Sequence, residues 1–333
     1  MTFTRRTIAG RETNPIGFGC MTLSWAYGTP PSDEDGARLL DAALDLGYDH
    51  LDTARIYGLG HNETLIGNAL AGKRNRFFLA SKTGIIVDGK ARRIDCKPET
   101  IRTALETSLQ LLGTDHIDLY YLHRRDFTVP IEESVGTLAD LVREGKIGSI
   151  GLSEMSSETV RRAHAEHPIA ALQTEYSPMT RNPEIAVLET CRELGITFVA
   201  FSPVGRGLLV DERPDPAVMP KGDIRPGMPR FQGENWTRNL ALAENFAALA
   251  AREGVTAAQL ALGWVLSRGE HIVAIPGTAR QDHLAENIAR WDWEPSAALV
   301  AEVDALINHQ TVAGHRYGPA MQATIDTEDF EAA

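Results

Sequence analysis

The stretch Gly47-Tyr48-Asp49-His50-Leu51-Asp52-Thr53-Ala54-Arg55-Ile56-Tyr57-Gly58 decides the fold and points to the chemistry. An amphipathic helix is expected before it over 33–47, and the apolar centre at His50 to Asp52 predicts a short buried strand. A second helix is expected over 63–71. Asp52 and Tyr57 are therefore expected at the C-terminal end of a strand and in the loop that follows it.

The same alternation of strand and helix continues along the chain. Strands are expected at 16–21, 50–52, 77–82, 117–123, 149–153, 171–175, 197–201 and 272–275. Helices are expected at 33–47, 63–71, 98–112, 131–144, 157–166, 183–195, 238–253 and 256–268. Short strands that are apolar on both faces and alternate with helices predict an α/β fold of the (β/α)8 TIM-barrel type. A doubly wound open sheet usually carries a G-x-G-x-x-G turn after its first strand, and this sequence lacks one there.

Three segments fall outside this alternation. Thr4 to Thr13 alternates and turns at Gly10, which predicts an N-terminal β-hairpin against the barrel floor. The Pro- and Gly-rich stretch 203–235 after the seventh strand shows neither period, and loops of this length are usually lids or substrate walls. An extended C-terminal tail follows over about 310–333, and composition predicts disorder in its last fifteen or so residues. No linker composition divides the chain, so we expect a single domain over 1–333.

Composition argues against several classes of protein. The net charge of −12 disfavours a nucleic-acid or anionic-membrane partner, because phosphate binding needs clustered Lys and Arg. No window approaches the roughly eighteen apolar residues of a membrane span, and Met1 to Gly10 lacks the apolar region of a secretory signal. Cys20, Cys96 and Cys191 show neither metal-ligand spacing nor a disulfide framework, so we expect a cytoplasmic location. Neither a coiled coil nor an apolar stripe indicates an obligate dimer, and the oligomeric state stays open.

Two further strands end in chemically active residues, Lys82 after the third and His123 after the fourth. The C-terminal ends of barrel strands converge on one mouth, so these two residues are expected to meet Asp52 and Tyr57 there. A phenol has an ordinary pKa of about 10, and a neighbouring ammonium lowers that pKa. Tyr57 is therefore the candidate general acid, Lys82 its tuner, Asp52 the anchor of Lys82, and His123 a donor that orients a substrate oxygen. Such a set fits proton delivery to a carbonyl that becomes an alcohol.

The later strand ends offer a site for a nicotinamide cofactor. Ser153 and Gln173 are suited to a carboxamide, and the Phe201 ring to stacking on the nicotinamide. Backbone N–H groups and glycines suited to a pyrophosphate follow the seventh strand, at Ser202, Pro203, Gly205, Gly207 and Leu208. The segment after the eighth strand opens a helix whose N-terminus is a ready anion site, with candidates Ile275, Gly277, Thr278, Arg280, His283, Glu286 and Asn287. Arg280 is expected to meet a 2′-phosphate, and Glu286 and Asn287 are expected to hold the adenine.

Candidate walls of a substrate pocket follow the first and fourth strands. Trp25 and Tyr27 come after the first strand, and Arg125 and Phe127 come after the fourth. The 203–235 loop and the tail near Tyr317 complete the set. These aromatic side chains favour a small-molecule carbonyl substrate that is apolar or carries a ring.

Taken together, these residues resemble the aldo-keto reductase superfamily over essentially the full chain, and its bacterial and plant NADP-dependent branches in particular. The matching motifs are Gly47–Ala54 with Tyr57-Gly58, Ser81-Lys82-Thr83, Leu122-His123, Gly151-Leu152-Ser153, Leu172–Ser177, Phe201–Gly207 and Ile275–Thr278. The resemblance implies a (β/α)8 barrel and NAD(P)H-dependent carbonyl reduction without metal or flavin. It also implies Asp52, Tyr57, Lys82 and His123 as a catalytic tetrad with Tyr57 as the acid.

Three residues depart from the family pattern. Glu154 stands where an Asn usually follows the serine of the fifth strand, and Phe201 stands where Tyr is more common. His283 stands where the helix after the eighth strand often carries a second basic residue. With Arg280 as the single cation, NADP(H) and NAD(H) both stay open, and we favour NADPH because a guanidinium beside the ribose gains most from a phosphate.

Two other functions fit parts of the sequence. Some members of the superfamily act as redox-sensing cytoplasmic subunits of potassium channels, and they keep the same tetrad. A metal-dependent barrel hydrolase would use His50, Asp52 and His123, and the first two have the spacing of a ligand pair. However, His50 lies within the family's own signature strand, and Lys82 would repel a cation, so no metal site is expected.

Overall fold

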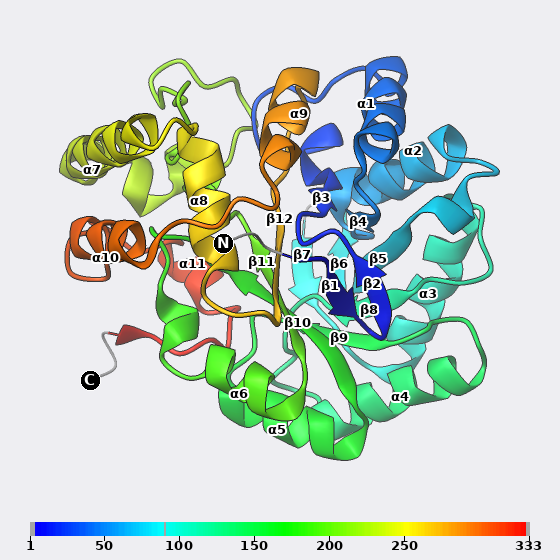
Figure 1. Ribbon diagram of the computed structural model, residues 1–333. Coiled ribbons are helices and arrows are strands. Elements are labelled where there is room, and N and C mark those ends of the chain that lie inside the picture. The colour runs from blue at the N-terminus through cyan, green and yellow to red at the C-terminus, as the bar shows by residue number, and fades with distance from the viewer. Residues whose placement is uncertain (1–3, 90, 331–333) are drawn as a thin grey trace.

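The computed structural model describes residues 4–89 and 91–330, and in that part of the chain eight parallel strands form one sheet surrounded by helices (Figure 1). In spatial order the strands are β12 (Ile272–Ile275), β11 (Thr197–Phe201), β10 (Ile169–Glu175), β9 (Ile150–Ser153), β8 (Leu119–Leu122), β5 (Phe78–Thr83), β4 (His50–Asp52) and β3 (Phe18–Gly19). A parallel bridge between Ile16 and Ala274 joins the two edges, and Gly17 N donates to Ala274 O at 2.8 Å. The expected (β/α)8 barrel is confirmed.

Two glycines allow the first and last strands to meet. A Cβ atom on Gly19 would lie 2.7 Å from the Ile275 carbonyl oxygen, and one on Gly277 would lie 2.7 Å from the Gly19 carbonyl oxygen. Any side chain at either position would force the edges of the barrel apart. The first strand also ends at Gly19, earlier than expected, because Cys20–Leu23 turn into the 3₁₀ helix η1 toward the mouth of the barrel.

Helices cover the outside of the barrel, and their ends follow local sequence signals. They are α1 (Asp33–Leu46), α2 (His61–Ala69), α3 (Pro98–Leu112), α4 (Ile131–Arg143), α5 (Ser157–Glu166), α6 (Val187–Leu194), α7 (Gly233–Arg252), α8 (Ala257–Leu266), α9 (Gln281–Ala289), α10 (Ala297–Leu306) and α11 (Pro319–Gln322). The Ser32 side chain caps α1 by accepting from Asp35 N, and Gly47 ends that helix with a φ of 99°. Helix α6 begins later than expected because Asn182–Glu184 form the 3₁₀ helix η4.

The expected N-terminal hairpin is present. Strand β1 (Arg6–Ile8) pairs antiparallel with β2 (Arg11–Thr13), dark blue in Figure 1. Ile8 is fully buried in the cluster that fills the inside of the barrel, together with Phe78 and Val199. The hairpin therefore closes the N-terminal floor, opposite the mouth where the strands end.

A second hairpin was not expected from the sequence. Strands β6 (Ile85–Asp88) and β7 (Ala91–Ile94) pair antiparallel directly after β5. The second of these strands carries Arg92 and Arg93, so it lacks the apolar alternation by which a strand is recognised. The hairpin stands at the mouth of the barrel.

The long loop and the tail are both packed against the barrel. Residues 203–235 hold only the short 3₁₀ turns η5 (Gly205–Gly207), η6 (Arg225–Gly227) and η7 (Pro229–Phe231) before α7 begins at Gly233. In the tail, Arg316 is buried and Ile325 packs on the core, so the expectation of disorder does not hold through residue 330. Buried contacts give this segment an ordered structure that its composition does not predict. The last three residues of the expected tail, 331–333, lie outside the described residues.

None of the helices in the described part of the chain has the length and apolar character that a membrane crossing requires.

Candidate active site

The inside of the barrel changes from apolar to polar toward its mouth. Along β5, the buried Ala80 is followed two residues later by Lys82, and along β8 Tyr121 is followed by His123. Side chains of a strand alternate between its two faces, so each polar residue lies on the inner face above an apolar one. Gln173 on β10 follows the inward-facing residues in the same way. The polar groups therefore meet above an apolar core.

Lys82 connects the expected tetrad. Its Nζ donates to Asp52 Oδ1, to the Thr53 carbonyl oxygen at 2.8 Å and to Tyr57 Oη at 3.4 Å. The Lys82 side chain is fully buried and that of Asp52 is 2% exposed. The ring of His123 lies 5.9 Å from the ring of Tyr57, at an angle of 83°. The structure thus brings all four side chains together at one place.

Burial governs the acidity of the phenol. It raises the pKa of Tyr57 above the ordinary value, and the charge of Lys82 offsets only part of that rise. This net direction is opposite to the lowered pKa expected from the sequence, because desolvation of the phenolate outweighs the attraction of the ammonium. Burial likewise opposes the charge on Lys82, yet Asp52 outweighs it and raises the pKa of Lys82. At neutral pH the site therefore holds a protonated phenol beside an ammonium.

The imidazole of His123 is neutral at ordinary pH. Burial lowers its pKa well below 6.5, and the charges of Arg124, Lys82 and Arg92 lower it further. A neutral imidazole still has one N–H group to donate. His123 is therefore suited to donate a hydrogen bond to an oxygen atom in the cavity without supplying a charge.

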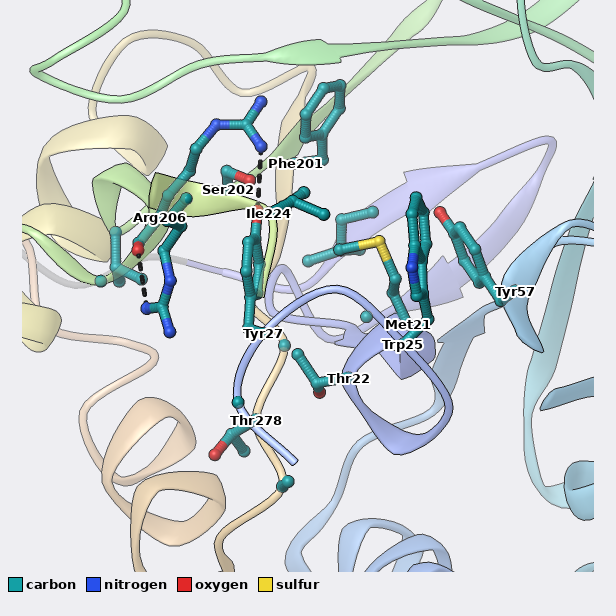
Figure 2. A pocket seen from close by; sticks show the side chains of 18 of the residues that line it. Met21, Thr22, Trp25, Tyr27, Tyr57, Phe201, Ser202, Arg206, Ile224 and Thr278 are labelled. Carbon is teal, nitrogen blue, oxygen red and sulfur yellow. Dashed lines mark hydrogen bonds between the residues drawn. The ribbon is translucent and has the colours of Figure 1, made fainter. Parts of the chain in front are cut away.

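A cavity opens at this mouth, and Asp52, Tyr57 and His123 line it. Many of the expected cofactor and substrate residues line the same cavity: Trp25, Tyr27, Ser153, Gln173, Phe201, Ser202, Pro203, Gly207, Ile275, Gly277, Thr278, Arg280, His283 and Tyr317. Figure 2 shows part of this lining, with the Tyr27 hydroxyl accepting a hydrogen bond from Arg206 Nη1 at 2.9 Å. The backbone at Ser202 and Gly207 has positive φ angles of 50° and 90°, which turns the loop after β11 along the cavity.

Four expected cofactor residues do not line the cavity. Gly205 is buried in η5, and Leu208 is an apolar core residue with 1% exposure. Glu286 and Asn287 lie in the second turn of α9, beyond the turn that reaches the cavity with His283. The expected contact of Glu286 and Asn287 with an adenine stays a prediction.

Two expected pocket residues also lie elsewhere. Arg125 donates to Thr159 Oγ1 at 2.7 Å and to Asp326 Oδ1 at 3.0 Å, so contacts with α5 and the tail draw it away from the cavity. Phe127 is 58% exposed and its ring lies 4.9 Å from the Arg125 guanidinium. The residue that reaches the cavity from this segment is instead Arg124, next to His123.

Further cavity residues were missed from the sequence. They are Met21 and Thr22 of η1, Ile56, Arg92 of the β6–β7 hairpin, and Arg124. Glu212, Ile224 and Arg225 belong to the 203–235 loop, which was expected to form a wall, and Met321 lies in the tail that follows Tyr317. Ile56 and Arg124 carried a sequence signal, since they are direct neighbours of Tyr57 and His123 in the chain. The others reach the cavity through loops whose path no local pattern predicts.

Glu154, the residue that departs from the family pattern, is bound within the protein. Both of its carboxylate oxygens accept from the Arg316 guanidinium, with Oε1 at 2.9 Å from Nη1. Glu175 forms ion pairs with Arg206 and with the same Arg316. Burial alone raises the pKa of Glu175, but the charges of Arg206 and Arg316 lower it to about 2. The tail is thus joined to the ends of β9 and β10 by a buried ionic cluster.

Within the described residues, no group of three or more His, Cys, Asp or Glu side chains is placed to hold a metal ion. His50 is fully buried below the mouth, with its ring edge-on to Phe78 at 5.6 Å. Asp52 is held by Lys82 and by Gln173 Nε2 at 2.7 Å. The hydrolase hypothesis therefore gains no support from the arrangement of its three residues.

Comparison with known sequences gives a family match and similar proteins from a plant and a yeast. The sequence profile of the Aldo/keto reductase family matches residues 15–308. The chain is 43% identical to a probable aldo-keto reductase 1 of Glycine max, over 92% of this chain and 89% of that protein. It is 41% identical to aldo-keto reductase yakc [NADP(+)] of Schizosaccharomyces pombe, over 95% of each chain.

Solved structures agree with the sequence relatives. The glycerol dehydrogenase AKR11B4 from Gluconobacter oxydans superposes with a TM-score of 0.83 at 29% identity, covering 96% of this chain and 98% of that one. An aldo-keto reductase from Klebsiella pneumoniae in complex with NADPH superposes with a TM-score of 0.71 at 26% identity, covering 92% and 96%.

Proposed function

The chain belongs to the aldo/keto reductase family, and from that premise we propose that it reduces aldehydes or ketones to alcohols with NADPH. The observation that carries the proposal is the buried contact of Lys82 with both Asp52 and Tyr57 beside a cavity. A yeast relative is named for NADP(+), and a related structure holds NADPH. NAD(H) is the alternative cofactor.

The cavity residues fit such a cofactor. Ser153 and Gln173 supply polar groups beside the tetrad, and the Phe201 ring lines the wall next to them. The turned backbone at Ser202 and Gly207 suits a pyrophosphate, and Arg280 stands on the rim at the start of α9. Bound NADPH supplies a hydride to the carbonyl carbon.

Each member of the tetrad then has a separate task. Tyr57 Oη gives its proton to the carbonyl oxygen, and the Lys82 ammonium stabilises the phenolate that remains. Asp52 keeps Lys82 charged and in place. The neutral His123 donates a hydrogen bond that orients the carbonyl oxygen. Because burial raises the pKa of Tyr57, the phenol stays protonated until it is used.

The direct test is steady oxidation of NADPH in the presence of an aromatic aldehyde such as 4-nitrobenzaldehyde. Continuous turnover is expected for a reductase. A redox-sensing regulatory subunit would oxidise only the cofactor it holds and then stop, and that result would favour the alternative function.

Cofactor preference provides a second test. In the structure, Arg280 is paired with Asp282 and with Glu212, the latter at 2.7 Å. We expect NADPH to give a higher kcat/KM than NADH, because a 2′-phosphate would compete for the same guanidinium. Arg280→Ala should reduce the ratio of kcat/KM with NADPH to kcat/KM with NADH by about tenfold, the effect of one charge-assisted hydrogen bond.

The matched control for that variant is Arg290→Ala, at the exposed C-terminal end of the same helix. This change should leave the cofactor ratio as in the wild type. Equal kcat/KM values for the two cofactors in the unmodified protein would contradict the preference.

We also propose that residues 1–333 form one domain, since one barrel spans most of the chain and the tail packs on it. The three cysteines are free and buried, which supports a cytoplasmic location.

A further inference from the structure

The cavity holds more positive charge than its carboxylates balance. Five arginines line it. Three of these form ion pairs: Arg206 with Glu175, Arg225 with Asp223, and Arg280 with Asp282 and Glu212. Among the described residues, no carboxylate lies within ion-pair distance of Arg92 or Arg124. Each of these two guanidinium groups therefore carries a positive charge that no ion pair balances among the described residues.

Arg124 is the more enclosed of the two, with 7% of its surface exposed. Its Nη1 donates to the His123 carbonyl oxygen at 2.6 Å and to Ser153 Oγ at 3.4 Å. Its Nε is buried and has no hydrogen-bond partner among the described residues. The carboxylate whose charge it influences, Glu154, is already bound by Arg316. A buried guanidinium left in this state is costly unless an anion arrives.

Arg92 stands at the rim of the cavity on the β6–β7 hairpin, and its side chain is exposed. The base of the hairpin is fixed to the barrel, because Asp95 N donates to Gly84 O at 2.9 Å and Cys96 N donates to Asp126 Oδ2 at 3.0 Å. Desolvation at the cavity rim and then the charge of Arg124 lower the pKa of Arg92. Both guanidinium groups line the same cavity, so two like charges face one space.

We propose that Arg92 and Arg124 bind a carboxylate carried by the carbonyl substrate itself, an inference that rests on the proposed function. Both arginines line the same cavity as Tyr57 and His123, so one molecule can present its carbonyl to the tetrad and its carboxylate to the pair. Two guanidinium groups match the two oxygens of a carboxylate and lose their mutual repulsion when it binds. A local positive field also attracts an anion into a protein whose net charge is −12.

Apolar side chains line the same cavity. Met21, Trp25 and Ile56 stand on its wall, and Figure 2 shows Met21 and Trp25 with Tyr57 in this lining. A substrate with an apolar or aromatic body between its carbonyl and its carboxylate satisfies both features. This adds a carboxylate to the apolar or ring-bearing carbonyl substrate that the aromatic residues suggested.

The test compares acids with their own methyl esters, which keep the aldehyde and remove the charge. The pairs are 4-formylbenzoate with methyl 4-formylbenzoate, and succinic semialdehyde with its methyl ester, each reduced with NADPH. We expect kcat/KM to be about tenfold or more higher for the acid of at least one pair, the effect of charge-assisted hydrogen bonds. Arg92→Gln should lose most of that advantage through KM, with the ester unaffected, and Arg92→Lys should keep part of it.

Arg93→Gln is the matched control. Arg93 is the next residue of β7, pairs with Asp95 and does not line the cavity, so its loss should leave acid and ester unchanged. Equal kcat/KM for acid and ester in both pairs would overturn the inference and leave the proposed function standing, as would an equal loss for both in Arg92→Gln. No oxidation of NADPH with any of the four compounds would overturn the proposed function, and the inference with it.

Discussion

Tyr57→Phe should lower kcat for aldehyde reduction by about 10²–10⁴-fold, the usual effect of losing a general acid. The variant keeps the ring that packs against His123 and removes the one hydroxyl that contacts Lys82 Nζ at 3.4 Å. The hydride step then leaves an alkoxide without a proton donor. NADPH binding, followed by fluorescence titration, should stay near the wild-type affinity because Tyr57 acts on the carbonyl oxygen.

Tyr121→Phe is the control for that experiment. It removes a second buried phenol hydroxyl near the same ammonium, whose Nζ lies 5.7 Å from the Tyr121 ring. Tyr121 does not line the cavity, so kcat should change only slightly. A Tyr57→Phe enzyme with wild-type kcat, or the same loss in both variants, would remove Tyr57 from the role of acid.

Arg316→Ala is expected to be the most destabilising change in the tail, with a loss of about 3–5 kcal/mol in the free energy of unfolding. The guanidinium is buried between Glu154 and Glu175, and its removal leaves both carboxylates with too little positive charge. Urea denaturation followed by tryptophan fluorescence measures the loss. Arg252→Ala removes an exposed ion pair with Glu302 and should cause a much smaller change.

The loss in Arg316→Ala should also depend on pH. The pKa of Glu175 falls from 4.5 to about 2 on folding, so its ion pairs stabilise the native state fully above about pH 4.5 and progressively less toward pH 2. The difference in stability between wild type and Arg316→Ala should therefore be largest near neutral pH and shrink in acid. A difference that stays constant over this range would mean that the buried carboxylates do not cause it.

The barrel and the tetrad could be predicted from the sequence because both depend on local order. Lys82 and His123 each follow a strand whose inward residues are fixed by alternation, so their position at the mouth needs no knowledge of distant contacts. The alternation of side chains does not extend to residues in the loops beyond a strand end. Arg125 was expected in the pocket, but Asp326 of the tail binds it and Arg124 takes the place at the cavity.

Features that depend on long-range packing were not predictable in this way. The partner of Glu154 is Arg316, far away along the chain in the C-terminal tail. The acidity of Tyr57 was misjudged because the sequence shows the neighbouring ammonium but not the depth of burial. The β6–β7 hairpin was missed because its arginines interrupt the strand pattern, and one of them, Arg92, now carries the proposal about the substrate.

The proposed reaction is direct hydride transfer from the nicotinamide to a carbonyl carbon, with a proton from Tyr57. The most direct measurement uses NADPH deuterated at both hydrogens of nicotinamide C4 to reduce 4-nitrobenzaldehyde, followed by NMR of the alcohol. We expect one deuterium on the alcohol carbon in essentially every product molecule. An alcohol that carries only hydrogen from water at that carbon, or no alcohol at all, would contradict it.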